Sequence, residues 1–134
     1  ERLCQPHMHA VDLSVLTAQV NIWLVDEAER CTDRARVADW DEAFHLALVQ
    51  ACGNSEMLRV HRELSERIRS VRRLDFTLQD RIQATYVEHA RILRAVMTQQ
   101  GDVVKELLTA HIQASQSQVR KITLHQIHQA RRSL

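Results

Sequence analysis

The chain is poor in the residues that interrupt helices. Its 134 residues include two glycines and one proline, whereas alanine, leucine, glutamine, glutamate and arginine are plentiful. Glycine and proline form most of the tight turns that a β-sheet requires, and the abundant residues favour helices. The composition therefore predicts an all-α fold. A chain of this length buries one core but not two, so we expect residues 1–134 to form a single domain.

Paired cysteines, an excess of one charge and long apolar runs are also lacking. Cys4, Cys31 and Cys52 are widely spaced and include no C-x-x-C pair, which argues against a disulfide framework and a thiolate zinc site and favours a reducing cytoplasm. The 18 Lys and Arg are balanced by 17 Asp and Glu, so we expect this segment alone to bind DNA poorly. No apolar run approaches the roughly 20 residues of a membrane span.

The spacing of apolar residues indicates five helices, over residues 12–31, 39–52, 56–74, 77–100 and 102–132. The expected N-terminal caps are Asp12 or Ser14, Asp39, Thr77 or Asp80, and Asp102. Gly53 with Asn54 forms a strong stop for the second helix, and Gly101 ends the fourth. Trp23 and Trp40 are expected to anchor the core or an interface. Short connections between these helices predict an antiparallel bundle.

Polar residues occupy positions where this pattern calls for apolar ones. Asp41 and His45 are four residues apart, so they share the side of a helix that also carries Phe44. His89 and His111 each interrupt the apolar series of a later helix. Because a buried carboxylate without a partner is costly, something must compensate Asp41.

A divalent cation would account for Asp41, His45, His89 and His111 together. Imidazole and carboxylate ligands suit Zn, Ni, Mn or Fe, and facing helices of a bundle often assemble such a centre. The competing interpretation is that each histidine is an ordinary core residue with a hydrogen-bond partner. His61 also lies on an inward-facing stripe, and its role stays open.

Other polar residues are left outside the predicted site. His7 and His9 belong to the terminal segment, and His125 and His128 lie near the C-terminal helix end, where solvent is their expected environment. Glu42 and His45 form a single Glu-x-x-His pair, whereas a ferritin-like di-iron centre needs two, so this centre is disfavoured.

Three separated segments occur in a distinctive order: Asp41-Glu42-Ala43-Phe44-His45 followed by Ala51-Cys52-Gly53-Asn54, then Glu88-His89-Ala90-Arg91-Ile92-Leu93-Arg94-Ala95-Val96, and finally Gly101-Asp102 with His111-Ile112. Together they resemble the FCD domain of GntR-type bacterial transcription factors. The resemblance runs from about Asp12 onward. It implies a bundle of about six helices, with the first helix only partly represented, and it implies that Asp41, His45, His89 and His111 are the metal ligands.

The resemblance also implies a role. Such domains enclose a metal and a small organic acid, a carboxylate or sugar acid, and form homodimers that position N-terminal winged-helix domains on an operator. No winged-helix sequence precedes Glu1, so we expect DNA binding only of a parent protein. No arginine of the first helix is assigned to the effector carboxylate, while Ser115, one turn beyond His111, is expected to contact the effector.

Two other functions stay open at this point. A metal-dependent enzyme would use the same open metal position to activate water, with Glu42 or Glu88 as the base. A structural helical interaction module would use neither metal nor effector. Because the chain contains no nucleophile elbow, phosphate loop or suitably placed cysteine nucleophile, a non-enzymatic sensor is the preferred prediction.

Overall fold

The computed structural model of the chain describes residues 12–77 and 79–133, and it confirms the all-α prediction. These residues form six α-helices, two short 3-10 helices and no strand. The α-helices are α1 (Thr17–Trp23), α2 (Arg34–Ala51), α3 (Ser55–Arg67), α4 (Arg69–Asp75), α5 (Gln79–Met97) and α6 (Gly101–Arg132). The 3-10 helices, Leu13–Leu16 and Glu27–Glu29, precede and follow α1. No helix in the described part of the chain is long and apolar enough to cross a membrane.

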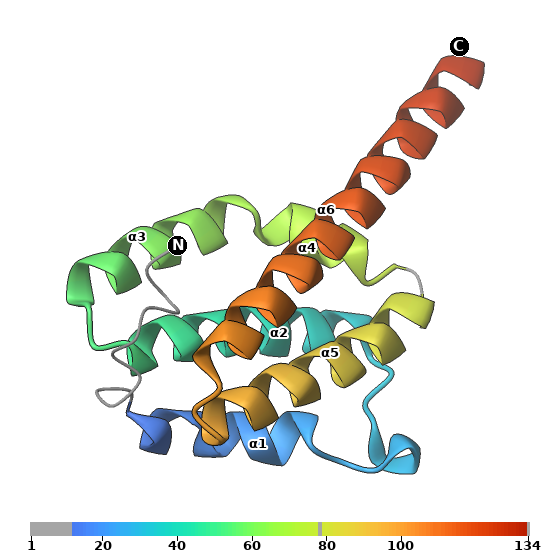
Figure 1. The fold of residues 1–134 in the computed structure, drawn as a ribbon. Helices are drawn as coiled ribbons and strands as arrows, with labels where there is room; N and C mark the ends of the chain where they lie inside the picture. The colour runs from blue at the N-terminus through green and yellow to red at the C-terminus, as the bar shows by residue number, and fades with distance from the viewer. Residues whose placement is uncertain (1–11, 78, 134) are drawn as a thin grey trace.

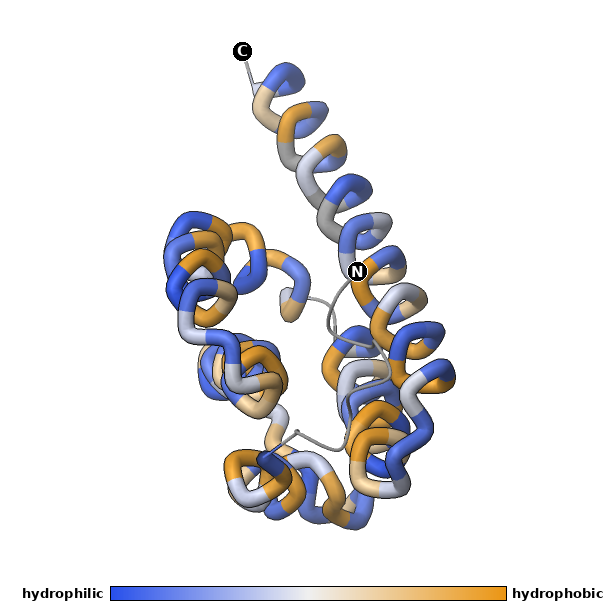
Figure 2. Tube along the Cα trace, turned by 60° about the vertical axis from the view of Figure 1, so that its left-hand side comes forward, coloured by the Kyte–Doolittle hydropathy of each residue, from blue (hydrophilic) through white to orange (hydrophobic). Residues whose placement is uncertain are grey.

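The helices surround α2, which crosses the middle of the molecule in Figure 1. α2 packs against α1, α3 and α4, while α5 packs against α1 and α6. α4 closes the other side by packing against α6. Figure 2 shows that the C-terminal turns of α6 continue beyond this bundle as a single helix. The helices that carry the predicted metal ligands, α2, α5 and α6, therefore lie around one interior.

Large aromatic side chains fill the centre of this interior. Trp23, Phe44 and Tyr86 are each at most 1% exposed. The indole of Trp23 lies edge-on to Phe44, with ring centroids 6.0 Å apart, and 4.9 Å from the ring of Tyr86. Trp40 is partly buried against the same core. Both tryptophans thus serve as packing anchors, as the sequence predicts.

The first helix is shorter than the apolar pattern predicts. Asp12 accepts a hydrogen bond from the backbone N–H of Ser14, as expected of a cap, but α1 ends at Trp23 and not near Cys31. Beyond it, the backbone N–H of Cys31 donates to the hydroxyl of Tyr86, and Arg30 donates to Gln83. These tertiary contacts with α5 hold the chain after the 3-10 helix Glu27–Glu29 in a path that is not α-helical and that local propensity does not reveal.

The second helix begins earlier than predicted. Asp33, and not Asp39, is its N-terminal cap, because the Asp33 carboxylate accepts a hydrogen bond from the backbone N–H of Arg36. Asp39 is exposed inside α2. The predicted stop is confirmed, since α2 ends at Ala51 and Gly53 has a φ of 72°. α2 consequently has almost two turns before Asp41, which places this ligand well inside the helix.

The predicted helix over 56–74 is interrupted. Ile68 has φ −97° and ψ 7°, which ends α3 and starts α4 without any glycine or proline. The change of direction lets α4 contact both α2 and α6. On α4, Arg72 reaches Asp41 of α2, and Asp75 reaches Arg81 of α5. Buried ion pairs with other helices thus accompany the break, and such contacts are not visible in local sequence.

The connection between α5 and α6 also differs in detail. α5 ends at Met97, and the left-handed residue of the turn is Gln99, with a φ of 55°, where the sequence suggests Gly101. Gly101 is the first residue of α6, and Asp102 lies in its first turn and not at the cap. Asp102 there still favours the helix electrostatically, because a negative charge near the N-terminus interacts well with the helix dipole.

The two glycines offer a matched test of this backbone description. An added Cβ at Gly53 meets no atom within 4 Å, so Gly53→Ala should destabilise only through its left-handed φ, by about 1 kcal/mol. Gly101→Ala, in the first turn of α6, should leave stability unchanged or raise it slightly. Urea unfolding midpoints of the two variants check this. Equal destabilisation by both substitutions would contradict the assigned conformations.

Candidate metal centre

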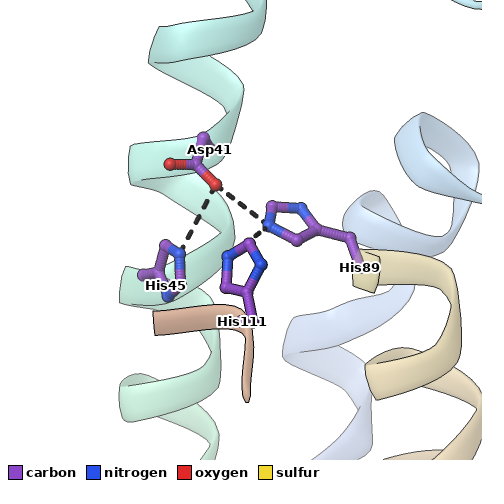
Figure 3. Close-up of side chains that lie close together, drawn as sticks. All are labelled: Asp41, His45, His89 and His111. Atoms are coloured by element: carbon purple, nitrogen blue, oxygen red, sulfur yellow. Dashed lines mark hydrogen bonds and ion pairs between the residues drawn. The ribbon is translucent and has the colours of Figure 1, made fainter. Parts of the chain in front are cut away.

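Four polar side chains from three helices meet inside the bundle. Asp41 and His45 lie one turn apart on α2, His89 comes from α5, and His111 comes from α6 (Figure 3). His89 is fully buried, Asp41 and His111 are 6% and 3% exposed, and His45 is half-buried. Each offers one ligand atom, and these four atoms all lie within 4.8 Å of one another. The sequence prediction that these residues come together agrees with this arrangement.

Three of the distances between the ligand atoms already match those around a shared metal ion, and all four atoms lie within 4.8 Å of one another. His89 Nε2 lies 2.9 Å from Asp41 Oδ1 and 3.3 Å from His111 Nε2, and His45 Nε2 lies 3.4 Å from Asp41 Oδ1. With metal–ligand bonds of about 2.0–2.2 Å, neighbouring ligand atoms around one ion are roughly 2.8–3.6 Å apart. The three observed separations fall within that range.

Hydrogen bonding alone does not satisfy these atoms. Asp41 Oδ1 is buried and has no hydrogen-bond partner, although His89 Nε2 approaches it closely. His111 Nδ1 contacts a carboxylate oxygen of Glu88, which can only accept when ionised, so Nδ1 carries the proton. In the neutral ring, Nε2 of His111 then presents a lone pair toward His89. Lone pairs and an unpartnered carboxylate oxygen that converge in this way are the donor set of a cation site.

The protein environment keeps Asp41 and His89 in their ligating forms. Burial lowers the pKa of His89 to about 3, so the ring is neutral near neutral pH. Burial opposes ionisation of Asp41, but the imidazoles of His45 and His89 outweigh it and hold the pKa of this carboxyl well below its usual value. Neutral imidazole and ionised carboxylate are the forms that coordinate a metal.

Neighbouring groups fix the orientation of two of the rings. The ring of His89 stacks on Phe44, with centroids 3.7 Å apart and an interplanar angle of 12°, and meets the edge of Trp23 at 4.2 Å. His111 is held instead by Glu88. Arg81, itself 6% exposed, donates to both oxygens of Glu88 at 3.0 and 3.1 Å. Burial opposes ionisation of Glu88, but His111 and Arg81 lower its pKa overall.

Arg81 extends this support to two further helices. Its Nη2 donates to Ser115 Oγ on α6 at 2.6 Å, and its Nε contacts Asp75 Oδ2 on α4 at 3.3 Å. Burial raises the pKa of Asp75, although Arg81 acts in the opposite direction. A single guanidinium therefore joins α4, α5 and α6 next to the candidate ligands. Through Glu88 it also supports the contact with His111, and carboxylate–histidine contacts of this kind tune a metal site.

A cavity of about 610 Å³ opens beside the four residues. Asp41, His45 and His111 line it, whereas His89 does not. Ser115 also lines the cavity, in agreement with its predicted position, although its hydroxyl already accepts a hydrogen bond from Arg81. A metal held by the cluster would therefore face a space large enough for a small organic molecule.

The remaining histidines lie apart from the cluster. His61 lines the same cavity, and its Nδ1 lies 3.3 Å from Ser65 Oγ, but it is outside the four-residue group. Burial lowers the pKa of His61, with His45 and Arg72 adding to the effect. His125 and His128 are exposed on the projecting part of α6, as predicted. His7 and His9 lie outside the described residues.

The sequence of this chain matches the FCD domain family over residues 2–114. The chain belongs to the FCD family. This agrees with the resemblance drawn from the separated motifs, and it makes the chain an effector-binding domain of the GntR type, found in regulatory proteins. No curated protein and no solved structure matches the chain. The match to the FCD domain ends one residue before Ser115, so the projecting turns of α6 lie beyond it.

Several polar residues of this FCD domain were not predicted from the sequence as part of the site, namely Arg72, Asp75, Arg81 and Arg120. Arg81 and Glu88 are seven residues apart, two turns along one face of α5, which is a signal that the sequence does contain. Arg72 stands beside Arg73, and only the position of the break at Ile68 decides which of them turns inward. No local pattern provides that information.

Glu88 offers a test of how His111 is held in the FCD domain. Glu88→Gln keeps the size of the side chain but removes the charge that orients His111, so we expect affinity for Zn²⁺ to fall about 10–100-fold. Glu63→Gln, on the exposed face of α3, is the matched control and should leave affinity unchanged. Titration of the metal-free protein with zinc against a competing chelator measures both. Unchanged affinity in Glu88→Gln would show that this carboxylate does not support the centre.

Proposed function

We propose that this chain is the ligand-sensing and dimerisation domain of a GntR-type regulator, and that it binds a divalent metal ion together with a small carboxylate effector. The observation that carries the proposal is the convergence of Asp41, His45, His89 and His111 beside a cavity that three of them line. Residues 1–134 are proposed to act as one domain.

The donor set limits the class of metal. Three imidazole nitrogens and one carboxylate oxygen suit Zn, Ni, Mn or Fe, and the lack of thiolate ligands disfavours the softer metals. When bound, the ion would supply positive charge and open coordination positions for an anionic oxygen of the effector. Because His89 is buried away from the cavity and the other three ligands line it, those open positions would face the cavity.

The cavity itself favours an anionic ligand. Arg72, which contacts Asp41, and Arg120 of α6 both line it. Ile68, Val71 and Ile112 add apolar surface between these polar groups. Guanidinium groups bind carboxylates through paired, charge-assisted hydrogen bonds. A small organic acid, a carboxylate or sugar acid, combines these features.

Binding at this position would couple to dimer geometry. α4 and α6 line the cavity together, and α6 continues beyond the bundle, so a ligand held between them favours one arrangement of the two helices. In a homodimer whose parent protein carries winged-helix domains, the preferred helix arrangement would change the affinity for DNA. The size of that change is limited by how much more tightly the effector binds one dimer arrangement than the other.

The contacts of the two predicted bases do not favour the enzymatic alternative. Both oxygens of Glu88 are engaged by Arg81, and one also contacts His111. Both oxygens of Glu42 accept hydrogen bonds from Arg69 on the outer face of α2. The pKa of each carboxyl group is lowered overall, which makes both carboxylates weaker general bases.

Metal binding and effector binding can be tested together. Elemental analysis of protein purified without chelator should find about one divalent ion per chain, and His89→Ala and His111→Ala should each lose it. His125→Ala, an exposed histidine of α6, is the control and should keep the ion. Small carboxylic acids should then raise the melting temperature of the wild-type protein and remain chemically unchanged. Wild-type protein that stays metal-free after incubation with each candidate ion would contradict the proposal, and turnover of the acid would favour the enzyme.

A further inference from the structure

We propose that the projecting turns of α6 carry a surface that binds the phosphate backbone of double-stranded DNA. This surface is the basic stripe, which consists of Lys121, His125, His128 and Arg132 with Arg131 beside them. It lies beyond the part of the chain that matches the FCD domain, and it includes none of the residues assigned to the metal or the effector. The contact is weak and independent of base sequence, and it adds to the DNA binding expected of a parent protein.

The nearly balanced charge of the whole chain conceals an uneven distribution. Residues 1–106 contain 14 Lys and Arg and all 17 Asp and Glu, whereas residues 107–134 contain four Lys and Arg and no acidic residue. The formal net charges of the two parts are therefore −3 and +4. The prediction of poor DNA binding rests on the total charge and does not take this distribution into account. A local surplus of positive charge attracts polyanions even on a protein that is neutral overall.

The basic side chains share one side of α6. Positions 121, 125, 128 and 132 are four, three and four residues apart, which places them above one another along about 17 Å of helix. All four residues are exposed, and so is Arg131. Within the described part of the chain, no ion pair involves any of them. Their charges and hydrogen-bond donors are thus available to an external anion.

The basic stripe is separate from the cavity beside the candidate metal centre. At about 3.6 residues per turn, it lies on roughly the opposite side of α6 from Ile112 and Gln116, which line that cavity. The turns that carry it continue beyond the bundle as a single helix (Figure 2). An α-helix with its side chains is about 10–12 Å across, and the major groove of DNA is about 12 Å wide. The projecting turns therefore have dimensions that suit a duplex.

The composition of these turns favours a duplex over single-stranded nucleic acid. Proteins that bind single strands stack the bases on aromatic side chains, and no Phe, Trp or Tyr follows Tyr86 in the chain. Glutamine, serine and threonine stand between the cations instead. Such side chains, together with Lys and Arg, make most of the contacts of proteins with the DNA backbone.

The same turns are less suited to an anionic membrane. A helix that lies on a membrane buries a broad apolar face, commonly with aromatic residues, and keeps its cations on the other side. Leu124 and Ile127 are exposed in the projecting turns. However, Leu124 is seven residues before Arg131 and so lies on the basic side of the helix. Duplex DNA is therefore the polyanion that this surface fits best.

Fluorescence anisotropy with a short labelled duplex of arbitrary sequence tests the proposal. The wild-type protein should bind at low salt, and the logarithm of its association constant should fall against that of the KCl concentration with a slope of about −2 to −3, as for about three phosphate contacts. A variant that combines Lys121→Gln, Arg131→Gln and Arg132→Gln should bind at least about tenfold more weakly, with a slope near zero, because these contacts are lost.

A second variant controls for the change in total charge. Arg62→Gln, Arg67→Gln and Arg91→Gln remove the same charge at exposed positions outside α6. This control should weaken DNA binding by about twofold or less, because its charges act only at a distance and are screened by salt. Both variants should keep the melting temperature and the metal content of the wild-type protein, since all six substituted side chains are exposed and lie outside the candidate metal centre.

Four results would overturn the assignment of the basic stripe to DNA. The first is wild-type protein that fails to bind the duplex at low salt, and the second is a control variant weakened as much as the stripe variant. The third is tighter wild-type binding to a single strand of the same length than to the duplex. The fourth is tighter binding to phosphatidylglycerol vesicles, which would identify an anionic membrane as the partner.

Discussion

The structure depends on the placement of an ionised carboxylate and three imidazoles inside an apolar core. Asp41, His89 and His111 are almost completely buried between α2, α5 and α6, and the ring of His89 packs against Phe44 and Trp23. Burying a charge without full compensation is expensive, and the hydrogen bonds present leave Asp41 Oδ1 without a partner. A divalent cation would balance the carboxylate and use the imidazole lone pairs. A cation at this position would therefore both compensate the buried charge of the fold and serve the proposed function.

The surrounding residues make this centre part of a larger polar network. Arg72 brings α4 to Asp41, and Arg81 joins Asp75, Glu88 and Ser115 from three helices. Since α4 lines the cavity and also contacts the groups that hold the candidate ligands, ligand and metal would each stabilise the arrangement that the other requires. Such coupling is reciprocal, so an effector that tightens metal binding is itself bound more tightly in the presence of metal.

The sequence predicts the helical fold and the four converging residues because both follow from local periodicity. The i, i+4 spacing of Asp41 and His45 and the polar interruptions at His89 and His111 mark inward-facing positions on separate helices. The end of α1 at Trp23 and the break at Ile68 depend instead on tertiary contacts, through Tyr86 and through the buried pairs of α4. For this reason, Arg72 and Asp75 do not emerge from the sequence, where Arg72 is one of two adjacent arginines and Asp75 one of many acids.

The central claim is that a metal ion links Asp41, His45, His89 and His111. The most direct measurement is anomalous X-ray diffraction at the absorption edges of Zn, Ni, Fe and Mn, from crystals of protein purified without chelator. The account predicts one anomalous peak inside the bundle, about 2.0–2.3 Å from a carboxylate oxygen of Asp41 and from one nitrogen of each histidine. Well-ordered density for the four side chains with no anomalous peak between them, or a peak bound elsewhere on the chain, would contradict it.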